Sequence, residues 1–262
     1  IYYNLNEDDK DKKITIKISD ENNRLVREID SQTDENFISY NGGPSREPVL
    51  SNNIGLNRFV WNTRHKSLNG VPYAYIEGRF SGHKAIPGKY KISLEVGGLS
   101  YTSSFEILKN PNFNVSDMDY AEFDKYSSHM EEKYNEMAVY INNNKIDKLT
   151  EVIKNIENNE DVKNNGKSLL NKMDNWDKKM MQRKSLAYDD VENFPNKFLA
   201  DYLFILDEIK GDIPNVSEGI LKSLESLDKK WDSLKEEIDN INENDIPSFN
   251  NELWKSGIGA LN

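Results

Sequence analysis

The most restrictive feature of this sequence is a change in hydrophobic spacing near residue 110. Before it, apolar residues alternate with polar ones, as in Ile14, Ile16 and Ile18. After it, apolar residues recur at steps of three and four, most regularly from Ile220 to Ile241. Alternation is typical of strands with one buried face, and steps of three and four are typical of helices. The sequence therefore predicts a β region followed by a helical region.

We place the domain boundary in a linker over residues 110–116, between a first domain at 1–109 and a second at 117–262. The linker contains one proline and several asparagines, which suit a connection better than regular structure. The charge balance changes at the same point. Residues 1–109 hold 15 Lys and Arg against 14 Asp and Glu, and the remainder holds 19 against 31, which together give the net charge of −11.

Residues 1–109 are predicted to form an immunoglobulin-like β-sandwich of about seven short strands. Two hairpins are expected at 14–29 and 90–107, the second turning at Gly97 and Gly98, with further strands at 1–5 and 57–62. Two stretches rich in Gly, Asn, Ser and Pro, Ser31–Ile54 and Arg64–Ala85, are predicted to be surface loops.

Residues 117–262 are predicted to form an antiparallel four-helix-type bundle, so the expected fold class is all-β followed by all-α. Ser116 is the expected N-cap of the first helix, and the second arm is expected to be interrupted around residues 158–166. A last amphipathic piece, Pro247–Trp254, is expected to cap the bundle or dock elsewhere. The fourth helix carries the clearest apolar seam: Ile220, Leu224, Leu227, Trp231, Leu234, Ile238 and Ile241.

The composition argues against several functions. A net charge of −11 repels phosphate backbones and anionic bilayers, and no apolar run is long enough to insert into a membrane. The absence of cysteine excludes disulfides and thiolate sites. The histidines, His65, His83 and His129, show no metal-ligand spacing, so each is predicted to be an ordinary surface or boundary residue. We expect no catalytic residue, cofactor or metal. The chain begins at Ile1 without a visible leader, and we expect a fragment or a processed chain.

Aromatic residues in the predicted loops are the candidate binding residues. Rings placed in loops stack on sugars or on partner side chains, whereas rings at periodic apolar positions belong to the core. Trp61, Trp176 and Trp231 are therefore expected in the core. The candidate contacts with a protein partner or a glycan are Tyr40, Tyr73, Tyr75 and Phe80.

Three motifs carry a family resemblance. They are Gly55-Leu-Asn-Arg-Phe-Val-Trp-Asn-Thr-Arg64, Ile86-Pro-Gly-Lys-Tyr-Lys-Ile-Ser-Leu94 and Leu99-Ser-Tyr-Thr-Ser-Ser-Phe105. With them the chain resembles the C-terminal region of bacterial sortilin-like, Asp-box (BNR-repeat) β-propeller proteins, which are often labelled glycosyl hydrolases. The hairpin at 13–29 is similar to the start of the immunoglobulin-like module of that family, which is related to the module of flagellar hook-capping proteins.

The resemblance implies an accessory function and an extracytoplasmic location. The propeller turns of that family, with Ser-x-Asp-x-Gly-x-x-Trp repeated once per blade, are missing from these 262 residues, and any hydrolytic activity would reside there. Our first hypothesis is therefore a non-catalytic interaction module that docks to a β-propeller or another protein. A glycan-binding accessory or part of a glycoside hydrolase is the second hypothesis. A structural spacer or oligomerisation element is the third.

Overall fold

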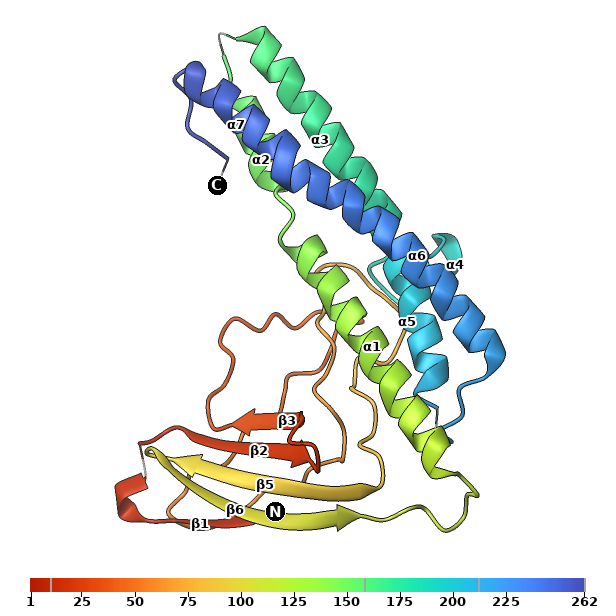
Figure 1. The fold of residues 1–262 in the computed structure, drawn as a ribbon. Coiled ribbons are helices and arrows are strands. Elements are labelled where there is room, and N and C mark those ends of the chain that lie inside the picture. Colours follow the sequence, from red (N-terminus) through yellow and green to blue (C-terminus); the bar gives the residue numbers. More distant parts are fainter. Residues whose placement is uncertain (10, 158, 212, 262) are drawn as a thin grey trace.

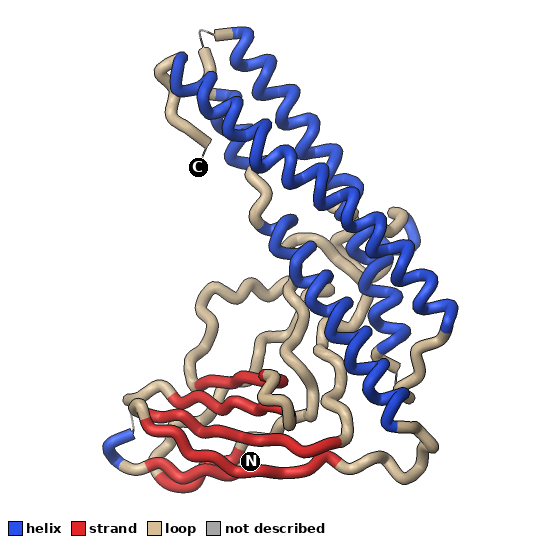
Figure 2. The backbone as a smooth tube through the Cα atoms, viewed as in Figure 1, coloured by secondary structure: helices blue, strands red, loops and turns tan. Residues whose placement is uncertain are grey.

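The computed structural model describes residues 1–261 apart from 10, 158 and 212, and it places a small β region below an elongated helical region (Figures 1 and 2). A four-stranded antiparallel sheet has the order β3-β2-β5-β6, and β1 pairs with β4 in a separate two-stranded sheet. The strands are β1 (Tyr2–Leu5), β2 (Ile14–Asp20), β3 (Leu25–Asp30), β4 (Gly55–Arg58), β5 (Gly88–Val96) and β6 (Leu99–Ile107). A short 3-10 helix, η1 (Glu7–Asp9), follows β1.

The predicted immunoglobulin-like sandwich is wrong in its second layer. The two predicted hairpins form, and Ile14, Ile16 and Ile18 are fully buried beneath Tyr3 and Leu5 of β1. However, β4 is shorter than the strand expected at 57–62, and among the described residues only β1 and β4 form strands that face the large sheet. The segments that would have completed a second sheet run as irregular chain, with one isolated bridge between Arg64 and Lys84.

The segment between β4 and β5 explains this difference. Residues 64–86, which we call the strap, leave the sheets and lie against the helices (Figure 1). Most of the strap is predicted to be a surface loop. Ala85 lies in the core of the sheets, but five other apolar side chains of the strap are buried in the helical core. These residues are Leu68, Val71, Ala74, Ile76 and Phe80. Because these five side chains pack on the helices, they do not contribute to a second sheet layer.

Two predicted features of the helices are present. Ser116 caps α1 in a capping box with Asp119. α6 buries the middle of the predicted apolar seam, including Trp231 and Leu234. The helical elements are α1 (Asp117–Asn142), α2 (Ile146–Lys154), α3 (Glu160–Met180), α4 (Asp190–Asn193), α5 (Phe198–Ile209), α6 (Glu218–Asn240), a π-helical turn η2 (Ile241–Asp245) and α7 (Ile246–Lys255). Among the residues described, no helix combines the length and the apolar character needed to cross a bilayer.

The predicted four-helix-type bundle is also wrong. α1 packs on α5, and α3 packs on α6 and α7, so helix pairs follow one another along one long rod instead of standing side by side (Figure 1). The rod is long because α7 continues α6 through η2. Pro247, at the start of α7, has no backbone N–H to donate within the helix, and the π turn before it accommodates this loss. The piece 247–254 is therefore a continuation of the fourth helix and not a separate cap.

The interruption expected around 158–166 lies earlier in the chain, and its residue 158 is outside the described residues. α2 ends at Lys154 and α3 is regular through Gly166. Gly166 is a packing residue: a Cβ atom there would lie 2.8 Å from side-chain atoms of both Ile153 and Phe249.

The domain boundary at 110–116 stays a prediction. The strap belongs to residues 1–109 but packs with residues 117–262.

Candidate functional site

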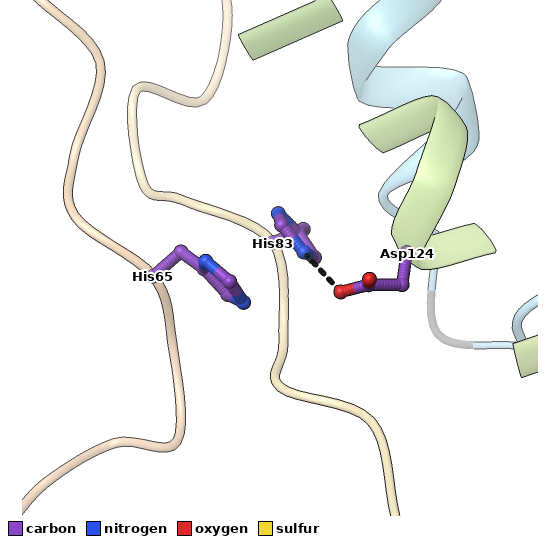
Figure 3. A group of neighbouring side chains, drawn as sticks. All are labelled: His65, His83 and Asp124. Atoms are coloured by element: carbon purple, nitrogen blue, oxygen red, sulfur yellow. Dashed lines mark hydrogen bonds and ion pairs between the residues drawn. The ribbon is translucent and has the colours of Figure 1, made fainter. Parts of the chain in front are cut away.

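Four polar side chains meet where the ends of the strap cross α1. His65 and His83 stand on neighbouring loop segments, linked by a 2.9 Å hydrogen bond from the backbone N–H of His65 to the carbonyl of His83. Asp124 and Glu131 lie two turns apart on α1, on its buried face. Figure 3 shows the two imidazole rings face to face, with Asp124 approaching His83 from the helix. We call these four residues the histidine cluster.

His83 is the centre of the cluster and is completely buried. Its Nδ1 lies 2.8 Å from Glu131 Oε2, and its Nε2 lies 3.2 Å from Asp124 Oδ1. Burial lowers the pKa of His83, but the hydrogen bonds to Asp124 and Glu131 outweigh it, so the pKa is raised above its ordinary value. The two carboxylates that hold the ring therefore favour its protonated form in the absence of a bound ion.

Asp124 connects the cluster to the sheet. Its Oδ2 accepts a 2.7 Å hydrogen bond from Arg24, which follows β2 and also pairs with Asp20. Burial raises the pKa of Asp124, but the hydrogen bonds from His83 and Arg24 outweigh it and lower the pKa below its usual range. Asp124 is consequently ionised, with one oxygen directed to His83 and the other to Arg24.

His65 differs from His83 although the rings stack at 3.8 Å between centroids. Its Nε2 is buried, and no group among the described residues hydrogen-bonds to it. Burial, reinforced by the charge on His83, lowers the pKa of His65 to about 3. Its backbone carbonyl accepts a 2.9 Å hydrogen bond from Arg27, which is also paired with Glu47. His65 is therefore a neutral imidazole with an unused ring nitrogen.

A cleft of about 650 Å³ borders the cluster. It lies between β3, the chain around Arg46 to Val49 and the outer part of α1, and both His65 and Glu131 line it. Basic residues (Arg24, Arg27, Arg46, Lys66) alternate there with acidic ones (Glu28, Asp30, Asp34, Glu47, Glu132). The cleft gives small polar solutes and ions a path to the cluster, and its mixed charge does not select one sign of ligand.

The cluster offers ligands for a metal ion. His65, His83 and Asp124 each present one ligand atom, and these atoms lie within 4.8 Å of one another. Two imidazoles and one carboxylate are a donor set that suits zinc and other first-row divalent ions. The expectation that the histidines are ordinary surface or boundary residues is wrong for His83, which is completely buried.

The predicted aromatic contacts are not gathered on one exposed face. Tyr73 is 71% exposed, Tyr75 is half-buried against Gly42, and Phe80 is buried against Tyr134. Tyr40 packs on Gly43 and Gly70, and burial raises the pKa of its hydroxyl to about 12. Of the tryptophans expected in the core, Trp176 and Trp231 are fully buried and Trp61 is half-buried.

One signal for the cluster was present in the sequence. Asp124 and Glu131 occupy positions in the apolar stripe of the first helix, between Phe123, Met130 and Tyr134. Carboxylates on a buried stripe need charged or hydrogen-bonding partners.

Comparison with family models, with curated proteins and with solved structures finds no match for this chain, so functional inference depends on its own geometry.

Proposed function

We propose that this chain is a non-catalytic protein-binding module that takes up an extended, uncharged segment of a partner protein along strand β6. One observation carries the proposal. Leu99 and Tyr101 of β6 lie on the core-facing side of the sheet but remain 60% and 58% exposed, because the two-stranded sheet does not cover them. A partner strand paired with β6 would cover this apolar strip.

The backbone of β6 supports strand addition. β6 is an edge strand, and among the described residues no strand pairs with its outer side. Its partner register runs from Val96 opposite Leu99 to Gly88 opposite Ile107. Residues that flank a two-residue hairpin turn form a hydrogen-bonded pair, so every second residue from Leu99 bonds to β5. The intervening residues, Ser100, Thr102, Ser104 and Glu106, direct their N–H and C=O groups outward.

A groove beside this edge provides room for side chains of the added strand. Its volume is about 320 Å³, and it lies between β6 and β1. Its apolar floor comes from Ile16 of β2 and from Ile92, Leu94 and Val96 of β5. Successive residues of an added strand point alternately toward and away from such a floor. The groove therefore favours a segment with apolar residues at every second position.

The side chains of β6 do not protect the edge. Natural proteins usually prevent unwanted strand pairing with lysine, proline or a bulge on an edge strand. β6 carries Ser100, Thr102, Ser103 and Ser104 along its middle, has Glu106 as its single charge, and pairs with β5 without a register shift. A long, neutral and regular edge is compatible with a soluble protein when a partner covers it. This argument favours a protein partner over a glycan, while docking to a β-propeller stays a prediction.

Peptide selection tests the proposal directly. A phage-displayed library of random dodecapeptides is selected on the full chain, and the affinity of the recovered peptides is measured by fluorescence anisotropy. Thr102→Pro removes an outward N–H without affecting the ladder to β5, and Thr102→Ala keeps that N–H and is the matched control. We expect peptides with alternating apolar residues, hydrogen-exchange protection confined to residues 99–107, and roughly tenfold weaker binding to Thr102→Pro.

Three results would count against the proposal. Peptides that bind Thr102→Pro as tightly as the unmodified chain do not use the edge of β6. Protection that maps to the helices points to another surface. Sedimentation that shows a dimer dissociated by Thr102→Pro indicates that a second copy of the chain covers β6, which is the oligomerisation hypothesis.

A further inference from the structure

We propose that His65, His83 and Asp124 form a binding site for one first-row divalent metal ion, with zinc as the expected occupant. The site is independent of the strand edge proposed above, because the β6 groove and the histidine cluster share no residue. Three separate observations carry it: the orientation of His83, the unused nitrogen of His65, and the fixed carboxylate of Asp124.

His83 is oriented as a metal ligand would be. Ligating histidines usually donate the N–H of the second ring nitrogen to a carboxylate, which fixes the tautomer and the direction of the ring. Glu131 Oε2 is 2.8 Å from His83 Nδ1, and Glu131 Oε1 also accepts a 2.7 Å hydrogen bond from the backbone N–H of His83. The other nitrogen, Nε2, is thereby directed to Asp124 Oδ1 at 3.2 Å. Donor atoms in a tetrahedral zinc site are about 3.3 Å apart.

His65 supplies a donor that lacks a partner. Buried polar atoms in folded proteins nearly always have a hydrogen-bond partner, so an exception calls for an explanation. His65 Nε2 is such an exception among the described residues. One ring nitrogen of His65 lies within 4.8 Å of ligand atoms of His83 and Asp124. Closing that separation to a coordination distance requires a movement of the ring by roughly 1 to 1.5 Å. His65 stands on irregular chain, which permits such a shift.

Asp124 is held for the third position. Arg24 binds Oδ2 at 2.7 Å, which leaves Oδ1 for the ion. Glu131 provides a second carboxylate close to the site. Because His65 and Glu131 line the 650 Å³ cleft, an ion enters from there and water completes its coordination.

The test uses the full chain, stripped with EDTA and dialysed, and then titrated with zinc chloride by isothermal calorimetry. We expect one zinc per chain. Cobalt chloride, added in a separate titration, should give the visible absorption of a low-symmetry site. His65→Phe keeps a ring stacked on His83 but removes the nitrogens, and it should weaken zinc binding at least about a hundredfold. Asp124→Asn should do the same while preserving the shape of the side chain.

His129→Gln is the matched control, since His129 is the remaining histidine of the sequence and pairs with Asp228 away from the cluster. It should bind zinc like the unmodified chain. The proposal is overturned if the chain binds no stoichiometric zinc, or if His65→Phe and Asp124→Asn bind it unchanged. Either result would leave His83 with a purely structural role. Thermal unfolding of each variant verifies that it is folded, and a folded His65→Phe alone decides the question if Asp124→Asn fails to fold.

Discussion

His83 and Glu131 are joined by two hydrogen bonds, one from the backbone N–H of His83 and one at its ring, at 2.7 and 2.8 Å. The pair attaches the end of the strap to α1 across 48 residues of sequence. Both residues are buried, and the neighbouring Phe123 contacts the edge of the His83 ring at 5.7 Å between centroids. The attachment of the β region to the helices therefore depends in part on a buried, hydrogen-bonded pair of polar residues.

Glu131→Gln should destabilise the protein. It removes a carboxylate that hydrogen-bonds to the buried His83 and favours its protonated form, and breaking a buried pair typically costs about 3–5 kcal/mol. The amide of glutamine retains part of the hydrogen bonding, so we expect a loss of about 2–4 kcal/mol in the free energy of unfolding in urea. Glu132→Gln, at the exposed next position, should change it by less than about 0.5 kcal/mol. Equal effects of the two changes would show that the pair contributes no special stability.

His65 should make the metal-free protein sensitive to acid. Burial, together with the charge of His83, lowers its pKa from 6.5 to about 3, with Arg24 and Arg27 adding repulsion and Asp124 opposing it. Between these values the unfolded chain binds a proton that the folded chain does not, so the free energy of unfolding falls as the pH decreases from 6.5 toward 3. The slope from this group is at most about 1.4 kcal/mol per pH unit.

Urea unfolding at pH 7, 6, 5 and 4 in the presence of EDTA measures this effect. At each pH, the free energy of unfolding of His65→Phe is compared with that of the unmodified chain. Taking this difference cancels the contribution of the many carboxylates, which titrate in both proteins. His65→Phe should gain stability relative to the unmodified chain as the pH falls. Parallel pH profiles for the two proteins would contradict the burial of a neutral imidazole at this position.

The elements that could be predicted from the sequence are those marked by a local signal, either a helix cap or a regular spacing of apolar residues. Ser116 with Asp119 marks the start of α1, and the seam through Trp231 and Leu234 marks α6, because capping and helical spacing are local properties. The strap could not be predicted, because its buried residues follow no period and are held by groups far away in sequence. Arg79 donates its backbone N–H to Asp207, 128 residues later, and the sequence carries no trace of that pairing. The histidine cluster was missed for the same reason, since it forms only when the strap meets α1.

Lys210→Met should loosen the strap. The buried ammonium of Lys210 donates hydrogen bonds to the carbonyls of Arg79 and Ser81 at 2.9 and 3.0 Å, and methionine leaves both carbonyls without that donor. Each unsatisfied buried group costs about 1–3 kcal/mol, so for the two carbonyls we expect a loss of about 2–6 kcal/mol in the free energy of unfolding, together with faster hydrogen exchange in residues 65–85.

The hydrogen-exchange rates of the backbone amides in β5 and β6 serve as the internal reference for that measurement. Among the described residues, no hydrogen bond joins Lys210 to either strand. Lys229→Met is the matched substitution on the surface. Lys229 forms an exposed pair with Glu225, and such pairs contribute little. Uniformly faster exchange over the whole chain in Lys210→Met would mean that the strap is not held separately.

Gly166→Ala should destabilise the protein although alanine favours helices. In an exposed helix this change gains up to about 1 kcal/mol. At Gly166 the added methyl group would lie 2.8 Å from atoms of Ile153 and Phe249, so α2 and α7 would have to move away from α3, and overpacking of this kind costs about 1–3 kcal/mol. The net effect expected in thermal unfolding is a lower Tm. Gly219→Ala, in the open first turn of α6 with no atom closer than 3.7 Å, should raise the Tm or leave it unchanged. A stabilising Gly166→Ala would show that the three helices do not pack as closely as described.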